Sequence, residues 1–364
     1  MDRRQFLRYS ALLGFSLSSG SLFSYAQSPK VPTDEKATSL LKTIQIIDAH
    51  AHPDRYTRDQ VDITSTLKAI KIMGMTASCF AAVGDATYLS RGRIPGTEYH
   101  YTKIQLEYWI KGLVKPGKVK LVLKASDVPS AINPDSPPGA ILAIEGGDPL
   151  EGKPGRVDEF YNLGVRMITL VHYRNNELGD IMRRWRSLDP GPMKNGLTPA
   201  GRKVVERMQD LGMVIDVAHA QSTTLKQIVE VSSKPLVDSH TSPCSGEDAS
   251  GCGRLRTWKQ MELVAKTGGV VCTWPLAYQI GNAVRRTFLD WAKEILEMKS
   301  RLGMAHVGLG TDGGGNIPDL IEGYRDVGDL VRLVAAMQEV GFSHEEIAAY
   351  MGGNFHRVLR DCIG

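Results

Sequence analysis

Residues 46–54 read IIDAHAHPD, a short apolar run that ends at an acid followed by two histidines, His50 and His52. Side chains at positions i and i+2 of a strand point to the same face, so the two imidazole rings would lie side by side. A single histidine at a strand end is most often a packed core residue. Two imidazoles on one face are typical ligands of a metal ion. The stretch therefore predicts a strand that carries metal ligands at its C-terminal end.

Short apolar runs of this kind recur along the chain and alternate with longer amphipathic stretches. The stretches over residues 198–212 and 287–303 have the spacing of helices that bury one face. Runs that are apolar on both faces are typical of a parallel sheet covered by helices. The apolar runs are eight in number and cover residues 43–50, 76–83, 140–147, 165–173, 213–219, 235–240, 269–276 and 306–313.

Eight strand–helix units predict an α/β fold, a (β/α)8 TIM barrel with its functional site at the C-terminal mouth. An open, doubly wound sheet is the alternative, and no GxGxxG motif follows any predicted strand to support it. The chain of 364 residues is 42% hydrophobic and 23% charged, which is typical of a globular protein with a substantial core. Its formal net charge is only +4 and it has no lysine- or arginine-rich block, so nucleic acid is not an expected partner.

The first 26 residues predict a signal peptide rather than a part of the fold. They have a basic start, a weakly apolar middle broken by Ser and Gly, and small residues before a cleavage point after Ala26. The middle is too short and too polar for a stable membrane span. The pair Arg3-Arg4 resembles a twin-arginine signal, although Asp2 stands where that pattern prefers Ser or Thr, and an ordinary secretory signal is the alternative. We therefore expect an exported, periplasmic protein with a single domain over residues 27–364.

The five cysteines are an odd number without a CxxC pair, which excludes a zinc-ribbon arrangement. In an oxidising periplasm Cys244 and Cys252 could close a short loop. For most of the five, a free buried thiol is the expected state; the others are Cys79, Cys272 and Cys362.

Polar residues stand at the ends of five of the predicted strands. In a barrel the C-terminal ends of all strands surround one mouth, so these side chains would converge. Each has a simple structural explanation when taken alone; an acid such as Asp312, for example, suits the turn before three glycines. Their shared position instead predicts a site for zinc or a similar divalent ion, because such ions bind imidazole and carboxylate together. The predicted ligands are His50, His52, Glu145, His219, His240 and Asp312.

Four stretches resemble the membrane dipeptidase (renal dipeptidase, peptidase M19) family of the amidohydrolase superfamily. They read GLTPAGRKVVERMQDLGMVIDVAHAQ (196–221), PLVDSHTSP (235–243), HVGLGTDGGG (306–315) and GGNFHRVL (352–359). The resemblance spans nearly the whole chain after the signal peptide, in order. It implies a (β/α)8 barrel that holds two zinc ions and hydrolyses dipeptides and related amides.

The resemblance also implies a role for each ligand. His50 would bind the first metal ion, Glu145 would bridge both ions, and His219 and His240 would bind the second. Asp312 would sit beside the first ion and transfer the proton.

Two further residues would contact the substrate. His172 matches the family's substrate-side histidine. Arg254 falls near the family's carboxylate-binding arginine, but the segment over residues 244–258 departs from the family pattern, so Arg256 is an alternative.

One ligand departs from the family pattern. The family has His-x-Asp at the end of the first strand, where this chain has His50-Ala51-His52. The His-x-His form is common elsewhere in the superfamily, so a ligand is kept while its charge changes. Asp54 is a second candidate for the missing carboxylate. This departure bears on the choice of substrate and metal more than on the existence of the site.

The expected chemistry is metal-assisted hydrolysis. Two bridged ions would lower the pKa of a bound water from about 15.7 towards about 7, which yields hydroxide at neutral pH. Asp312 would take the proton and deliver it to the leaving amine, and His172 would donate a hydrogen bond to the oxyanion. No lysine ends the fourth strand, so a carboxylated lysine is not expected and Glu145 would serve as the bridge.

Two other functions stay open from the sequence. One is a different amidohydrolase activity on the same barrel, either an N-acyl-amino-acid deacylase or a lactonase. The other is a metal-binding protein without catalysis, against which the full set of catalytic residues argues. The expected partner is a small dipeptide-like substrate, and because family members commonly dimerise, a homodimer is a further expectation.

Overall fold

The computed structural model describes residues 34–53, 63–89, 96–129, 136–182, 188–244, 252–280, 283–315 and 317–364. The predicted signal peptide and Asp54 lie outside these described residues. No helix of the described part is long and apolar enough to cross a membrane.

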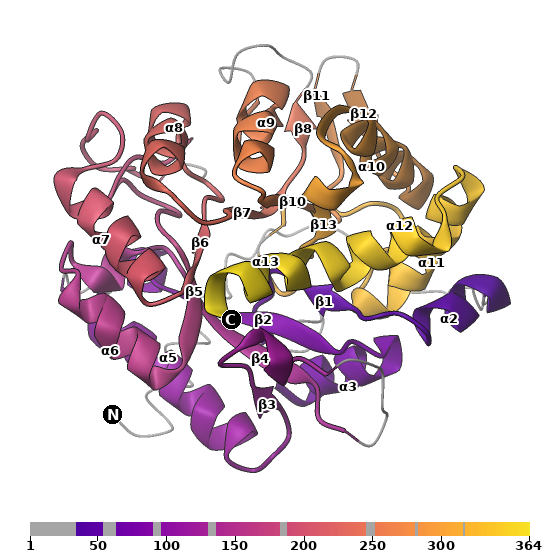
Figure 1. Ribbon diagram of the computed structural model, residues 1–364, viewed down its shortest axis with the longest axis horizontal. Coiled ribbons are helices and arrows are strands. Elements are labelled where there is room, and N and C mark those ends of the chain that lie inside the picture. The colour runs from indigo at the N-terminus through magenta and orange to yellow at the C-terminus, as the bar shows by residue number, and fades with distance from the viewer. Residues whose placement is uncertain are drawn as a thin grey trace, which may run out of the picture.

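Eight parallel strands form a barrel in the order in which they occur in the chain (Figure 1). The first and last strands also meet, since Ala49 N donates to Leu309 O at 3.0 Å and His52 N donates to Gly313 O at 2.7 Å. The predicted barrel is therefore confirmed, and the alternative of an open sheet is wrong. A short strand β3 (Lys120–Leu121) pairs with the first two residues of β4. The barrel strands are β1 (Ile47–Asp48), β2 (Ala77–Val83), β4 (Gly139–Glu145), β5 (Val165–Thr169), β6 (Val214–Asp216), β7 (Val237–Thr241), β10 (Val270–Thr273) and β13 (Val307–Leu309).

Helices surround the barrel, as Figure 1 shows. The sequence marks their ends: Thr287 caps α10 by accepting a hydrogen bond from Asp290 N, and Gly303 ends this helix with a positive φ of 86°. The main helices are α2 (Glu35–Leu41), α3 (Ile63–Met73), α4 (Ala86–Leu89), α5 (Glu98–Trp109), α6 (Gly155–Leu163), α7 (Pro199–Asp210), α8 (Ser222–Val231), α9 (Trp258–Lys266), α10 (Phe288–Leu302), α11 (Leu330–Glu339), α12 (His344–Ala348) and α13 (Asn354–Ile363).

In several strands, alternate residues belong to two different hydrophobic clusters. In β4, Leu142 and Ile144 pack in the layer between strands and helices, whereas Ile141 and Ala143 belong to the cluster inside the barrel. The period of two then places Glu145 on the inner face, at the end where the strand opens into the mouth.

Helix α13 crosses the barrel in front of the strands in Figure 1 and contributes its apolar face to the inner cluster. Its residues Phe355, Val358 and Leu359 pack there with residues such as Ile47 and Val214. This helix therefore closes the end of the barrel that lies opposite the mouth.

The cysteines divide as the sequence indicated. Cys244 and Cys252 form a disulfide, and Cys79, Cys272 and Cys362 are free and buried. The disulfide lies beside two short strands, β8 (Pro243–Cys244) and β9 (Arg256–Thr257), which pair in parallel. An antiparallel hairpin, β11 (Tyr278–Ile280) and β12 (Ala283–Arg285), follows β10.

Phe355→Ala should destabilise the protein by about 3–5 kcal/mol, because it leaves a cavity under the inner cluster that the helix cannot refill. Arg360→Ala on the exposed face of the same helix is the matched control and should change stability by no more than about 0.5 kcal/mol. Denaturant unfolding measures both. Equal stability of the two variants would show that α13 does not support the barrel.

Candidate metal centre

The carboxylate of Glu145 lies at the centre of the barrel mouth and is 2% exposed. Its Oε1 atom is 3.1 Å from His219 Nε2 and 3.5 Å from the Nε2 atoms of both His50 and His240. These histidines end three other strands, so one carboxylate oxygen faces imidazole nitrogens from several directions.

The other oxygen of Glu145 faces a second set of side chains. Its Oε2 atom is 3.5 Å from His52 Nε2 and 3.4 Å from His172 Nε2. His52 Nε2 also lies 3.2 Å from Asp312 Oδ1. The barrel thus brings together all six predicted ligands, with His172 beside them, and the two carboxylate oxygens face different donors, as a bridging carboxylate requires.

The donor atoms fit divalent ions. Three sets of three side chains each have one donor atom per residue within 4.8 Å of one another. His50 Nε2 is buried and makes no hydrogen bond in the described part of the chain. A buried polar atom without a hydrogen bond is costly, and a metal ion between His50 Nε2 and the Glu145 carboxylate, 3.5 Å away, would satisfy it. The sets are His50–His52–Glu145, His50–His240–Asp312 and Glu145–His172–His219.

Electrostatics holds three of the donors in the forms that bind metal. His50 differs: burial would lower its pKa, but the Glu145 carboxylate raises the pKa of His50 to about 9, so this ring would release a proton when an ion binds. Burial lowers the pKa of both His219 and His240 well below its ordinary value, so both rings are neutral. Burial alone would raise the pKa of Glu145, but His172 and His50 hold this pKa well below its ordinary value. A neutral imidazole and an ionised carboxylate are the species that ligate zinc-like ions.

Ser239 orients two of the imidazole rings. Its hydroxyl donates to Asp216 Oδ2 at 2.7 Å, so its oxygen is left to accept from ring nitrogens. His240 Nδ1 lies at 2.9 Å and His50 Nδ1 at 3.3 Å from this oxygen. A proton on Nδ1 leaves the Nε2 lone pair of His240 directed at the site, and it does the same for His50 once that ring has released its second proton. Partners of this kind fix the tautomer of a metal-binding histidine.

Buried acids position the strand ends. Asp216 also accepts from the backbone N atoms of Ala218 and Ser239, both at 3.0 Å. Asp48 accepts from Thr311 N at 2.8 Å and from His50 N at 3.2 Å, so it joins the first strand to the last. Sequence reasoning missed both acids as functional residues. Their signal was an aspartate two or three residues before a histidine, in IIDAH and IDVAH.

Asp85, which follows β2, holds His172, the histidine predicted to face the substrate. Its carboxylate is fully buried, lies 2.9 Å from His172 Nδ1 and accepts from Tyr173 N at 2.7 Å. The second ring nitrogen of His172 therefore faces Glu145 and the mouth. No motif in the sequence pointed to Asp85, because it lies 87 positions from His172 and meets it only in the folded barrel.

The two candidate arginines have different surroundings. Arg256 is fully buried; its Nε donates to Asp238 Oδ2 at 2.7 Å, and its other nitrogens donate to the carbonyls of Val217 and Ala220. These contacts hold the backbone on either side of His219, so Arg256 supports the structure. Arg254 is partly exposed, and its Nη2 donates to His172 O at 3.2 Å. Of the two, Arg254 is the one beside His172.

Two of the site residues have strained backbones. Among the described residues, positive φ outside glycine occurs at Glu151, Asn195, His219 (67°) and Asp312 (49°). Left-handed backbone is unfavourable for such residues and is often found at functional sites.

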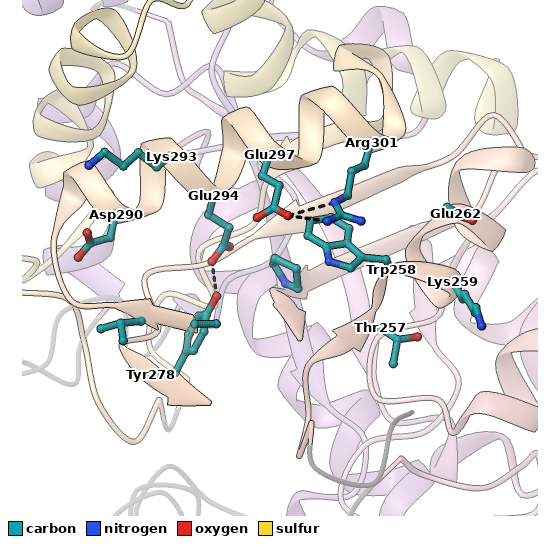
Figure 2. A pocket seen from close by; sticks show the side chains of 13 residues that line it. Thr257, Trp258, Lys259, Glu262, Tyr278, Asp290, Lys293, Glu294, Glu297 and Arg301 are labelled. Atoms are coloured by element: carbon teal, nitrogen blue, oxygen red, sulfur yellow. Dashed lines mark hydrogen bonds and ion pairs between the residues drawn. The ribbon is translucent and has the colours of Figure 1, made fainter. Parts of the chain in front are cut away.

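A separate pocket lies on the outer layer of the barrel. Figure 2 shows it between α9 and α10, with Trp258, Tyr278 and Glu294 among its walls; its volume is roughly 660 Å3. Two of its charged side chains, Arg301 and Glu297, pair at 3.0 Å. None of the predicted metal ligands lines this pocket, so the side chains at the strand ends, and not this pocket, define the candidate centre.

Solved structures share the fold. A probable dipeptidase, PvdM, from Pseudomonas aeruginosa superimposes with a TM-score of 0.76 at 20% identity, over 90% of this chain and 98% of that chain. A metallopeptidase from Rhodobacter sphaeroides, solved with a phosphinate mimic of the dipeptide L-Ala-D-Ala, gives a TM-score of 0.70 at 20% identity, over 88% and 99%.

Curated relatives match the sequence. Dipeptidase tcpJ of Claviceps purpurea is 28% identical over 228 residues, which are 61% of this chain and 50% of the relative. Dipeptidase 3 of Mus musculus is 29% identical over 224 residues, 60% of this chain and 44% of the relative. The chain spans about half the length of the curated relatives it matches. The family model of membrane dipeptidase, peptidase family M19, matches residues 34–362, and the chain belongs to this family.

Proposed function

We propose that the protein is a metal-dependent dipeptidase that hydrolyses the amide bond of dipeptides, with two zinc ions per chain. The observation that carries the proposal is the placement of Glu145, whose two oxygens face different histidines within 3.5 Å, in a chain of the membrane dipeptidase family. His50, His52, His219, His240, Glu145 and Asp312 would hold the ions. When bound, divalent ions of this kind polarise a carbonyl and lower the pKa of water.

The chain's own residues would supply the remaining chemistry. Asp312, 8% exposed at the mouth, is placed to take a proton from water and to return it to the leaving amine. His172, fixed through Nδ1 by Asp85, would donate from Nε2 to the developing oxyanion. Arg254 would bind the substrate carboxylate through charge-assisted hydrogen bonds.

Hydrolysis of N-acyl amino acids or lactones on the same barrel is the alternative function. An N-acyl amino acid carries the same carboxylate as a dipeptide, so Arg254 would not distinguish the two. His52, which stands where the family has aspartate, also favours an altered substrate range, including lactones. A protein that binds metal without catalysis is the weaker alternative, because a mere binder has no use for a proton-transferring acid beside His52.

We also propose that the protein is exported to an oxidising compartment such as the periplasm. The Cys244–Cys252 disulfide and the signal-like pattern of residues 1–26 support this proposal, since disulfides persist mainly in such compartments.

The test of the proposed function is a hydrolysis screen of the purified, zinc-reconstituted protein. The panel holds L-L, L-D and D-D dipeptides, N-acyl amino acids and lactones. Turnover of dipeptides above the other classes supports the proposal, and turnover confined to another class replaces it.

Asp312→Asn should retain most bound metal and lose nearly all turnover, because an amide cannot accept the proton from water. Elemental analysis and steady-state kinetics measure the two effects. Wild-type turnover in this variant would exclude the proton-transfer role.

Glu145→Ala should lose at least one metal ion per chain, because it removes the carboxylate that would separate two cations about 3.5–4 Å apart. Elemental analysis after dialysis measures the content. If two ions are retained, another group forms the bridge.

His52→Asp should keep bound metal and a working site, since both side chains reach a metal from this position, whereas His52→Ala should weaken metal binding and activity severely. Metal content and turnover of the two variants are compared side by side. A His52→Ala protein with normal metal content and rate would show that His52 is only a neighbour and would make Asp54 the ligand to test.

A further inference from the structure

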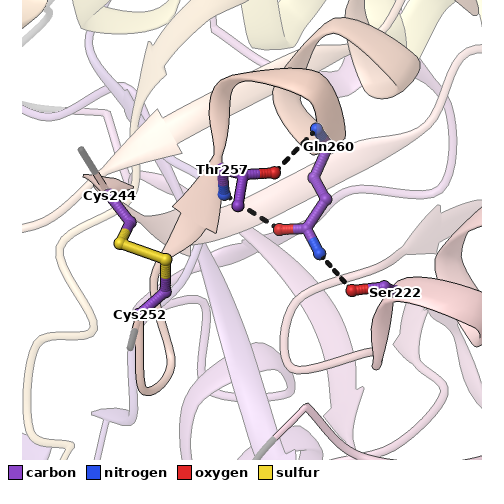
Figure 3. The surroundings of a disulfide bond; sticks show 5 residues. All are labelled: Ser222, Cys244, Cys252, Thr257 and Gln260. Atoms are coloured by element: carbon purple, nitrogen blue, oxygen red, sulfur yellow. Dashed lines mark hydrogen bonds between the residues drawn. A yellow bond between two sulfur atoms is a disulfide. The ribbon is translucent and has the colours of Figure 1, made fainter. Parts of the chain in front are cut away.

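The Cys244–Cys252 disulfide joins two segments that carry residues of the proposed site. Cys244 ends β8, which directly follows β7 and its His240. Cys252 lies two residues before Arg254. Figure 3 shows the disulfide beside the paired strands, near the Thr257 cap of α9. The bond therefore fixes the distance between the strand that carries a proposed metal ligand and the segment that carries the proposed carboxylate-binding arginine.

Arg254 lies between two fixed points. On its N-terminal side, Cys252 is buried and covalently tied to Cys244. On its C-terminal side, Arg256 is fully buried and paired with Asp238 at 2.7 Å. The guanidinium of Arg254 then extends to His172 O at 3.2 Å. Its reach towards the mouth is thus set by an anchor two residues away on each side.

The disulfide also packs against the wall of the mouth. Cys244 and Cys252 form a buried cluster with Leu255, Trp274 and Leu276. The Trp274 ring lies 5.3 Å from the ring of His240, measured between centroids. This packing places the bond within one side-chain layer of a proposed metal ligand.

We propose that the Cys244–Cys252 disulfide is a positioning element, which holds Arg254 where it binds the carboxylate of the substrate. The inference rests on the proposed function, because it takes Arg254 as the carboxylate-binding residue. Without the bond, Arg254 loses its anchor at Cys252 and regains conformational freedom that must be lost again when the substrate binds. Loss of the bond should therefore weaken the binding of substrates that carry a carboxylate.

The test compares wild type, Arg254→Ala, the double variant Cys244→Ala with Cys252→Ala, and the triple variant, all as the full zinc-reconstituted chain. Each is assayed on a dipeptide and on its C-terminal amide. Arg254→Ala should raise KM for the dipeptide about ten- to a hundredfold, the range for losing hydrogen bonds to a charged group. The double cysteine variant should raise this KM at least about threefold.

Three readouts separate positioning from general support of the fold. Neither variant should raise KM for the amide, which lacks the charge. The triple variant should match Arg254→Ala, because the disulfide acts through the arginine. Cys362→Ala, a free thiol on α13 at the far end of the barrel, is the matched control and should keep the wild-type KM.

Chemical reduction of the wild type provides a second test of the disulfide's role. A water-soluble phosphine breaks the S–S bond, gives two thiols and becomes the phosphine oxide, with water supplying the oxygen and the two protons. The reduced wild type should acquire the KM of the double cysteine variant, and that variant should not change on the same treatment. Metal content is measured in parallel.

The outcomes distinguish a failure of the inference about the disulfide from a failure of the role proposed for Arg254. If Arg254→Ala raises KM and the double cysteine variant does not, the inference is overturned and the proposed function stands. If Arg254→Ala itself leaves KM unchanged, the role of the arginine fails and the inference fails with it. If the double cysteine variant instead loses metal or kcat, the disulfide supports the metal centre as a whole and the inference is again overturned.

Discussion

The site depends on the interaction between the buried carboxylate of Glu145 and the five imidazole rings that surround it. An isolated ionised group in this position would be strongly unfavourable, so Glu145 requires compensating charge and hydrogen bonds close by. The barrel provides them by ending separate strands at the same height around the carboxylate. The arrangement concentrates oxygen and nitrogen donor atoms at one point, which suits the binding of a cation.

Three of the five imidazole rings are oriented by polar side chains behind them. Ser239 and Asp216 act on the rings of His240 and His50, and Asp85 acts on His172. These supports are themselves buried and bonded to backbone atoms of neighbouring strands. The ring orientations are therefore properties of the sheet, and a change in strand register would misplace the donors together.

The sequence allowed the barrel, and the convergence of the candidate ligands at its mouth, to be predicted, because both depend on local patterns. An apolar run that ends in a histidine or acid marks a strand and its mouth-facing end at once. Asp85 was missed because its partner His172 is distant in the chain. The choice between Arg254 and Arg256 was likewise open, since only the fold shows that Arg256 faces Asp238 and backbone carbonyls.

The left-handed backbone at His219 and Asp312 has a consequence for how this protein is inactivated. Glycine would suit those angles, but it carries no donor atom, so the chain accepts a local cost of about 1–3 kcal/mol at each position. An ion that binds these side chains offsets this cost only while it is present. With the proposed ions bound, the mouth would be the part of the barrel whose order depends most on them, so inactivation by chelators or heat is expected to begin there, before the sheet itself opens.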